Sequence, residues 1–316
     1  MSAGLAEQLN AGMVLCDGGY LIELERRGYV RSGSDREKVG TGRGSGTFTP
    51  EVAIEAPAAL RGLHEEFLRA GAQVLQALTF FATRTKLERS GYGKETELIN
   101  RAAVAIAREV AGDRALVAGS VSRTQLMEKE GPGAAPRIRD LLAEQIGFLK
   151  DAGVDFLILE TFFHVAEMRI GLEEARKTGL PVVATYSLRP TPDMTTDGVV
   201  AAEACRIAVA EGALAAGLNC EQEPARMIPV LRAIRAALPP GAHVAAQPAA
   251  LCTTDAKPYF TGMPEFPDAL ETIQIGRGAF EEFGRTARAE GIRFVGGCCG
   301  ANAAYIRALA AGVAAR

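Results

Sequence analysis

Two adjacent cysteines near the end of the chain are the residues whose type and spacing point most directly to chemistry. Cys298 and Cys299 lie in the sequence Phe-Val-Gly-Gly-Cys-Cys-Gly at residues 294–300. Neighbouring side chains of a regular strand point to opposite faces, so these thiols converge only where the strand ends and the backbone turns. The flanking glycines permit that turn. A third thiol, Cys220, ends another apolar run, and the three together could hold a thiophilic metal ion.

Three thiolates would give zinc an electron-rich site with one open position. Structural zinc sites are closed by four protein ligands, whereas catalytic sites keep a position for water or substrate. A net charge of about −1 makes such a zinc a poor activator of water but suits it to bind a fourth thiol and keep it deprotonated, below the ordinary thiol pKa of about 8.5. A closed site and three unmetallated thiols are the alternatives. No histidine is placed to close the site, because His64 and His164 lie in helical patterns and His243 begins a strand.

Two carboxylates follow other apolar runs. Asp17 precedes Gly18 and Gly19 after the first run, and Glu160 ends the fourth. Such a carboxylate can hold a substrate ammonium, act as a base, or only cap a loop. Two carboxylates near a thiol-binding zinc indicate an amino acid that carries a thiol, and the glycine amides beside Asp17 could bind the carboxylate of that amino acid.

These residues are positioned by an alternation of short apolar runs and longer amphipathic stretches. The predicted strands are 14–16, 74–78, 115–119, 156–159, 182–186, 213–218, 243–246 and 294–295. The predicted helices are 50–70, 95–111, 138–152, 165–178, 199–211, 224–238, 278–289 and 302–314. The first of these helices is predicted to have Thr49 as its N-cap and Pro50 at its first position, and to end before Gly71. Eight βα units without a break in composition predict a single (β/α)8 TIM barrel over residues 1–316.

A TIM barrel has its active site at the C-terminal ends of its strands, here called the rim. Polar or thiol residues follow six of the predicted strands: Asp17-Gly18-Gly19, Thr79-Phe80-Phe81, Glu160-Thr161, Asn219-Cys220, Gln247-Pro248 and Cys298-Cys299. The polar, glycine-rich segment 31–49 follows the first strand at the same end, as either a loose surface loop or a mobile lid.

The overall composition excludes several classes of function. A net charge of −3 gives no sign of binding to nucleic acid or to an anionic membrane surface. No apolar run approaches the roughly 20 residues of a membrane span, and the first ten residues do not form a signal peptide. Six cysteines in 316 residues do not suggest a disulfide framework. We therefore expect a cytoplasmic protein, and a homo-oligomer is possible.

The chain resembles the homocysteine S-methyltransferases, and within them the betaine-type branch, over essentially its whole length. The shared motifs are Asp17-Gly18-Gly19-Tyr20, Leu24-Glu25-Arg26-Arg27-Gly28-Tyr29-Val30, Leu63-His64-Glu65-Glu66-Phe67-Leu68-Arg69-Ala70-Gly71, Gln76 with Thr79-Phe80, Leu116-Val117-Ala118-Gly119, Glu160 with His164-Val165, Asn219-Cys220, Gln247-Pro248, Pro264-Glu265-Phe266-Pro267 and Gly296-Gly297-Cys298-Cys299-Gly300. The cysteine pattern is the most specific of them.

The resemblance implies a zinc-dependent barrel. Cys220, Cys298 and Cys299 match the family's zinc ligands, and Asp17 and Glu160 match carboxylates that bind homocysteine, with Gly18 beside them. The implied reaction is a direct in-line methyl transfer from a small onium donor to the zinc-activated thiolate of homocysteine, which gives methionine. No protein side chain is then needed as a catalytic base at the transfer step, and positioning dominates catalysis.

The chain departs from the betaine-type pattern around the methyl donor. It has no tryptophan; Phe48 stands where the family has one, and Phe81 and Thr161 replace two tyrosines. Phe48, Phe80 and Phe81 could still form a weaker aromatic cage, with Tyr259 as a further candidate. Glycine betaine, proline betaine, a dimethylsulfonio acid and S-methylmethionine all remain possible donors. A methyltransferase fed by a methyl-corrinoid protein and a non-catalytic zinc or redox-sensing barrel are the alternatives.

Overall fold

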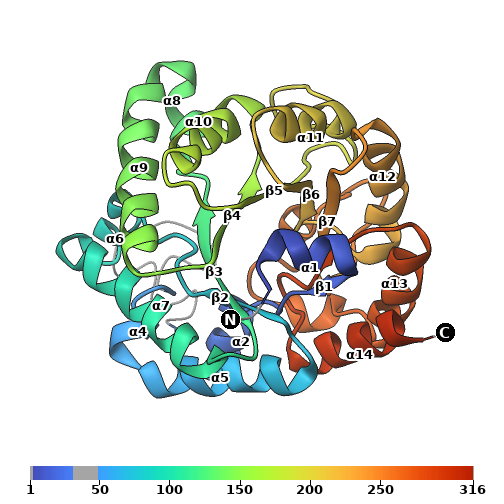
Figure 1. The fold of residues 1–316 in the computed structure, drawn as a ribbon, viewed down its shortest axis with the longest axis horizontal. Coiled ribbons are helices and arrows are strands. Elements are labelled where there is room, and N and C mark those ends of the chain that lie inside the picture. Colours follow the sequence, from blue (N-terminus) through green and yellow to red (C-terminus); the bar gives the residue numbers. More distant parts are fainter. Residues whose placement is uncertain (1–2, 31–48, 316) are drawn as a thin grey trace.

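Eight parallel strands form a barrel in the computed structural model, which describes residues 3–30 and 49–315 (Figure 1). The strands are β1 Val14–Leu15, β2 Val74–Ala77, β3 Leu116–Ser122, β4 Phe156–Phe162, β5 Val182–Tyr186, β6 Ala215–Asn219, β7 His243–Gln247 and β8 Phe294–Val295. Their order in the sheet is β1-β8-β7-β6-β5-β4-β3-β2. A bridge between Cys16 and Val74 brings the β1 and β2 ends together. The predicted (β/α)8 TIM barrel is confirmed.

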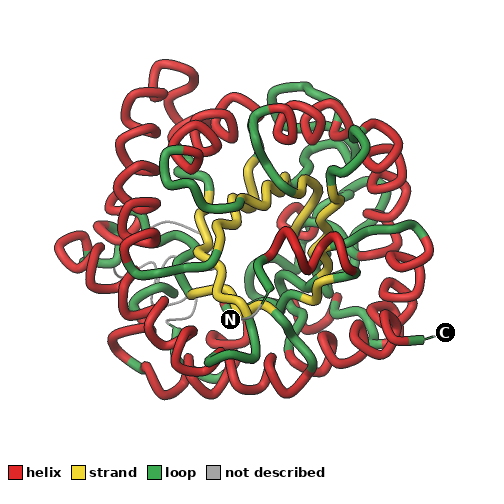
Figure 2. Tube along the Cα trace, viewed as in Figure 1, coloured by secondary structure: helices red, strands yellow, loops and turns green. Residues whose placement is uncertain are grey.

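Helices cover the outside of the barrel all the way round (Figure 2). The α-helices are α1 Leu5–Ala11, α2 Leu21–Arg26, α4 Val52–Glu55, α5 Pro57–Ala70, α6 Arg84–Glu88, α7 Thr96–Ala111, α8 Leu126–Glu130, α9 Ala135–Asp151, α10 Val165–Arg176, α11 Ala201–Ala210, α12 Pro224–Ala237, α13 Gly278–Ala289 and α14 Ala303–Ala314. Short 3-10 helices are η1 Gly93–Glu95, η2 Gly131–Ala134, η3 Phe260–Gly262 and η4 Leu270–Ile273. Among the described residues, no helix is both long and apolar enough to cross a membrane.

The barrel interior is packed with side chains rather than open. Phe156, Ile158 and Phe294 are fully buried there, together with small residues of the other strands. At the N-terminal end, α1 lies across the barrel opening and places Leu5 and Leu9 in the same apolar cluster (Figure 1). Because α1 packs across this end, the C-terminal ends of the strands are the open end of the barrel, where sites of this fold lie.

All eight predicted strands are present, and most of their ends coincide with the predicted ones or lie within two residues of them. The larger differences are at β3 and β4, which continue three residues beyond the predicted ends. The pairing of β4 with β5 shifts between Leu159 and Phe162, so β4 bulges where it carries Glu160. The extension therefore reaches directly into the predicted site.

The predicted helix over 50–70 is interrupted. Ala56 has φ −141° and ψ 57°, which separates α4 from α5. Its cause is Pro57, because the ring of a proline disfavours the helical conformation of the residue before it. The expected N-cap role of Thr49 is wrong, since α4 begins at Val52 and the Thr49 hydroxyl has no hydrogen-bond partner. The predicted end at Gly71 is confirmed, with φ 109°.

Candidate metal and substrate site

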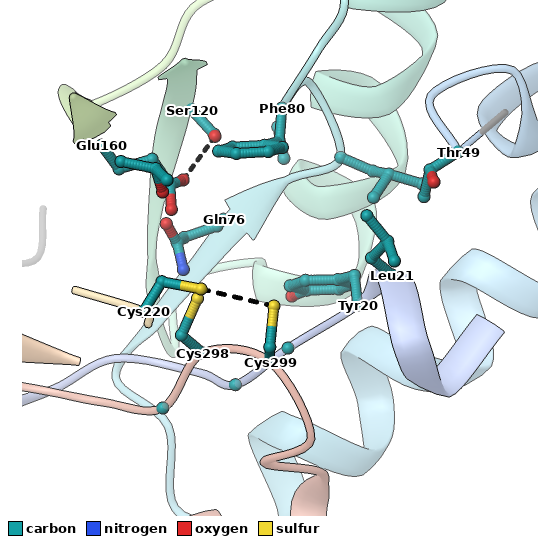
Figure 3. Close-up of a pocket in the computed structure, with 16 residues that line it drawn as sticks. Tyr20, Leu21, Thr49, Gln76, Phe80, Ser120, Glu160, Cys220, Cys298 and Cys299 are labelled. Atoms are coloured by element: carbon teal, nitrogen blue, oxygen red, sulfur yellow. Dashed lines mark hydrogen bonds between the residues drawn. The ribbon is translucent and has the colours of Figure 1, made fainter. Parts of the chain in front are cut away.

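Three cysteine sulfurs meet at the rim, as the sequence predicted (Figure 3). The Sγ atoms of Cys220, Cys298 and Cys299 all lie within 4.8 Å of one another, and the Cys220 and Cys299 sulfurs are 3.4 Å apart. Cys220 is buried, whereas the other two are partly exposed. The thiols therefore form one cluster that faces a cavity.

The turn after β8 is what lets two adjacent thiols converge. The Gly297 amide donates to the carbonyl of Asp17 at 2.9 Å, and the Cys298 amide donates to the carbonyl of Pro248 at 2.9 Å. The Ala301 amide then closes a turn on the carbonyl of Cys298 at 3.0 Å, with Gly300 at φ 77°. Only glycine adopts that conformation without strain.

A glycine in the loop after β1 lets this loop pack against the cysteine turn. A Cβ atom built on Gly18 would lie 2.0 Å from the carbonyl oxygen of Ala301. The Gly19 amide donates to that same oxygen at 2.9 Å. The loop after β1 and the loop after β8 are thus one packed unit, and the backbone of Gly18 lines the thiol cavity.

The donor set fits a tetrahedral zinc ion. Two sulfurs bound to one zinc at about 2.3 Å lie about 3.8 Å apart, close to the separations found here. The pKa of the Cys220 thiol is held well below its usual value, because the thiols of Cys298 and Cys299 donate hydrogen bonds to it. The cluster thus stabilises negative charge on sulfur, which is the form that binds metal.

Glu160 lies above the thiols on the bulged part of β4 (Figure 3). The Ser120 hydroxyl donates to its Oε1 at 2.5 Å, and the Asn219 side-chain amide donates to its Oε2 at 3.3 Å. Burial raises the pKa of Glu160 to about 8. A cation bound beside this carboxyl would restore the ionised form.

Gln76 presents an unused acceptor next to Glu160 (Figure 3). Its Nε2 donates to Asp17 at 2.9 Å, and this bond fixes the orientation of the amide. Its Oε1 is buried without a partner. A buried acceptor costs free energy unless something donates to it, and a substrate ammonium beside Glu160 would supply the donor.

Asp17 is held differently from Glu160. It is fully buried and accepts hydrogen bonds from the backbone amide of Gln76 at 2.7 Å, from the Gln76 side chain, from the Tyr20 hydroxyl and from the Cys16 thiol. Burial raises the pKa of Asp17 to about 6. Its oxygens are taken up by these donors, and Asp17 does not line the thiol cavity. Its neighbours Gly18, Tyr20 and Gln76 do line it.

His64 supports this arrangement from behind. Its Nδ1 lies 2.8 Å from the Tyr20 oxygen. Because the Tyr20 proton is donated to Asp17, Nδ1 must carry the proton that is shared with Tyr20. Burial lowers the pKa of His64 to about 3, so the ring is neutral. In the described chain neither His64 nor His243 joins a potential metal cluster, and His164 lies with Glu128 and Glu167, apart from the thiols.

The predicted donor residues are only partly brought together. Phe80 and Thr161 line the thiol cavity, and Phe81 lines the neighbouring one. Tyr259 lines neither of them and lies at a separate pocket beside Arg189. Phe48 and the segment 31–48 lie outside the described residues, so the lid and the full aromatic cage stay predictions.

Several residues of the site have no clear signal in the sequence. Ser120 and Asn219 orient Glu160, and the Asn219 side chain also accepts from the Thr161 amide and donates to the Thr161 hydroxyl, both at 2.8 Å. In the sequence, Asn219 was marked by its position directly before Cys220 at a strand end and by the Asn219-Cys220 motif that the chain shares with the family.

The sequence relatives decide the family. A sequence profile described as homocysteine S-methyltransferase matches residues 14–313. The betaine–homocysteine S-methyltransferase 1 of Xenopus tropicalis is 38% identical over 318 residues, which cover 97% of this chain and 74% of that protein. The chain belongs to the homocysteine S-methyltransferase family. A second member, the S-methylmethionine–homocysteine S-methyltransferase BHMT2 of Pongo abelii, is 36% identical over 313 residues, which cover 97% of this chain and 80% of that protein.

A solved structure supports the fold of this homocysteine S-methyltransferase. The homocysteine methyltransferase MmuM of Escherichia coli, solved in a metallated form, superposes with a TM-score of 0.72 at 20% identity. The match covers 94% of this chain and 95% of that one. The chain is therefore an enzyme of the methyltransferase class, built on the barrel that the sequence predicted.

Proposed function

We propose that this protein transfers a methyl group from a small onium donor to homocysteine and forms methionine, with zinc held by Cys220, Cys298 and Cys299. The observation that carries the proposal is the cluster of three thiols beside a buried carboxyl, Glu160, on one cavity. Membership of the family supports homocysteine as the acceptor. The curated relatives are named for two different donors, betaine and S-methylmethionine, so the family alone does not select one.

The thiol cluster is the acceptor end of the site. When bound, zinc would supply the Lewis acidity that keeps the thiol of homocysteine deprotonated at neutral pH. Glu160 and the unpartnered Oε1 of Gln76 would hold the ammonium group of the amino acid. Asp17 would position other residues of the site, because its hydrogen bonds fix Gln76 and Tyr20 at the cavity wall. Gly18 would contribute its backbone to the same wall.

The methyl transfer itself needs no protein acid or base. The thiolate electron pair forms the new S–CH3 bond, while the bond between the methyl carbon and the onium nitrogen or sulfur breaks and leaves its electron pair on that atom. The products are methionine and a neutral amine or sulfide. The contribution of the chain is to align the two substrates between Phe80, Leu21 and Thr161, which line the way from the thiols outward.

Metal analysis tests the ligand assignment. Purified protein should hold about one zinc per chain, and Cys298→Ala should lose most of it. Cys252→Ala removes an exposed cysteine outside the cluster and should retain zinc, so it is the matched control. Full zinc occupancy in Cys298→Ala would overturn the assignment.

A donor panel tests the reaction. Homocysteine should yield methionine with at least one of glycine betaine, proline betaine, a dimethylsulfonio acid and S-methylmethionine. Methionine formation only with a methyl-corrinoid protein would replace direct transfer by the first alternative. Bound zinc without methionine from any of these donors would favour the non-catalytic zinc or redox-sensing barrel.

A further inference from the structure

A second cavity opens directly beside the thiol cavity. The two share Leu21, Phe80, Thr161, Cys220 and Cys299 in their walls, so they are lobes of one site. Among the residues that the structure describes, four cationic side chains line the outer lobe: Lys86, Arg89, Arg123 and Arg189. We call this outer region the basic lobe.

Lys86 is a buried lysine that forms no ion pair with the residues that the structure describes. Only 7% of the residue is exposed, and its ammonium lies 3.8 Å from the centre of the Phe81 ring. Within the described part of the chain it makes no hydrogen bond or ion pair to a carboxylate. Burial lowers the pKa of Lys86 well below its usual value, and the neighbouring Arg123 and Arg89 lower it further.

Arg123 is buried and only half satisfied. It is 8% exposed, and its Nε donates to Glu128 at 2.7 Å. Its Nη1 is buried without a partner. The guanidinium lies 3.8 Å from the centre of the Phe163 ring, and the guanidinium of Arg189 lies 3.9 Å from the same centre. Aromatic faces thus hold these cations in place without neutralising them.

The anionic side chains of the basic lobe do not balance its cations. Among the described residues that line it, Glu221 is the carboxylate, and it accepts from Thr261 at 2.7 Å and lies 4.0 Å from Arg189. Glu128 is engaged by Arg123. Leaving Lys86 and the Nη1 atom of Arg123 buried and unpaired is costly. Proteins retain such groups where a ligand completes the pairing.

We propose that the basic lobe binds an anionic group of the methyl donor, a carboxylate or a phosphate, and that Lys86 and Nη1 of Arg123 contact it directly. This inference rests on the proposed function and specifies its donor. The onium group of the donor would lie toward Phe80 and Thr161, next to the thiolate, and its anionic end would lie among the cations.

This arrangement assigns Phe81 a different role from the predicted cage. The face of its ring is covered by Lys86 at 3.8 Å, so the ring is not free to receive an onium group on that face. Phe81 instead supports the anion-binding lysine. An elongated zwitterion therefore suits this site better than a compact cation such as choline.

The test compares donors that differ at one end only. Choline, glycine betaine and phosphocholine share a trimethylammonium group and end in a hydroxyl, a carboxylate and a phosphate; dimethylsulfoniopropionate and its methyl ester form a second pair. We expect the member with the anionic end to have a kcat/KM at least about 10-fold above the member whose end is uncharged, because a charged hydrogen bond of this kind gives about 10- to 150-fold. Comparing methionine formation from glycine betaine with that from phosphocholine shows whether the lobe takes a carboxylate or a phosphate. Equal kcat/KM values for donors with an anionic end and donors with an uncharged end would overturn the proposal.

Variants locate the effect. Lys86→Met should raise KM for the donor with the anionic end about 10-fold or more and leave KM unchanged for the donor whose end is uncharged, whereas Lys86→Arg should keep most of the preference. Lys150→Met, which removes an exposed lysine on α9, is the matched control and should change neither. If Lys86→Met raises KM equally for donors with an anionic end and donors with an uncharged end, Lys86 does not contact the anion directly.

A binding measurement separates this inference from the proposed function. Titration calorimetry with glutarate and with inorganic phosphate should show binding to the wild-type protein that is lost in Lys86→Met and kept in Lys150→Met. If no donor yields methionine but this pattern holds, the proposed function fails and the anion site stands. If methionine forms but neither anion binding nor the donor preference depends on Lys86, the anion site is refuted.

Discussion

Replacing Glu160 by glutamine separates the binding of homocysteine from every other task of the site. The substitution keeps the size of the side chain and its contact with Ser120, but it removes the negative charge. A charge-assisted hydrogen bond to a buried group contributes about 1.5–3 kcal/mol. We therefore expect kcat/KM for homocysteine to fall about 10- to 150-fold, while KM for the methyl donor stays the same.

The assay compares homocysteine with 4-mercaptobutanoate, which has the same thiol and carboxylate but lacks the amino group. The wild-type enzyme should prefer homocysteine. Glu160→Gln should lose that preference, because neither homocysteine nor 4-mercaptobutanoate can form the contact between an ammonium and a carboxylate in this variant. Glu174→Gln, a buried carboxyl on α10 that is ion-paired with Arg139 and Lys177, is the control. If Glu160→Gln slows both acceptors equally, Glu160 does not bind the ammonium and the reasoning fails.

The remaining predictions concern stability and backbone fit. In metal-free protein, the Glu160 carboxyl keeps its proton up to about pH 8 when folded but only to about 4.5 when unfolded. The stabilisation of the wild type by this carboxyl is therefore complete below pH 4.5, and up to about 5 kcal/mol of unfolding free energy is lost relative to Glu160→Gln as the pH rises through 8. Urea unfolding of both proteins at several pH values would show this loss. A difference in unfolding free energy that does not change with pH would contradict it. Asn219→Ala removes the acceptor of the Thr161 amide and the donor to Oε2 of Glu160, whose Oε1 keeps Ser120. We expect unfolding to cost about 2–4 kcal/mol less and KM for homocysteine to rise; an unchanged KM would remove Asn219 from the site. Gly18→Ala must displace the carbonyl of Ala301 and should lower zinc occupancy, whereas Gly62→Ala, with open space around its Cβ position, should leave zinc unchanged; equal occupancy in both would refute the packing argument.

The strands and the thiol cluster could be predicted because both leave local signals. An apolar run that ends in a polar residue or a thiol marks a strand and its rim end together. The parallel arrangement then brings all such ends to one place. For this reason Cys220 was expected to meet Cys298 and Cys299, although it is far from them in sequence. The short helices α1, α2, α6 and α8 were not predicted, because helices of five to seven residues are held by tertiary packing rather than by a periodic pattern.

The supporting network around the carboxyls could not be predicted. Gln76 and Asp17 are 59 residues apart, and Ser120 and Glu160 are 40 residues apart. Which of two carboxyls is saturated by protein donors depends on side-chain packing, and the sequence contains no sign of it. For the same reason Asp17 and Glu160 were assigned the same role, whereas the structure places only Glu160 at the cavity wall. Lys86 lies on α6, whereas Arg123 and Arg189 lie in two separate loops, so no single motif marks the basic lobe.

Backbone conformation explains how so many side chains reach one site. Neighbouring residues of a regular strand point to opposite faces. At the rim, however, three pairs of adjacent residues have both members in the walls of the thiol cavity or the basic lobe: Phe80-Phe81, Glu160-Thr161 and Cys220-Glu221. Each pair contains a residue in the left-handed region, namely Phe81, Thr161, and both Cys220 and Glu221, with φ between 55° and 64°.

Such a conformation costs on the order of 1–3 kcal/mol per non-glycine residue, and it persists only where the surroundings determine it. Asn219 does so for Thr161, and the Gln247 carbonyl does so for Cys220, whose amide donates to it at 2.9 Å. Each left-handed turn sends one residue of its pair toward the thiols and Glu160 and lets the other reach the basic lobe. The left-handed turns thus let single strand ends line both the thiol cavity and the basic lobe.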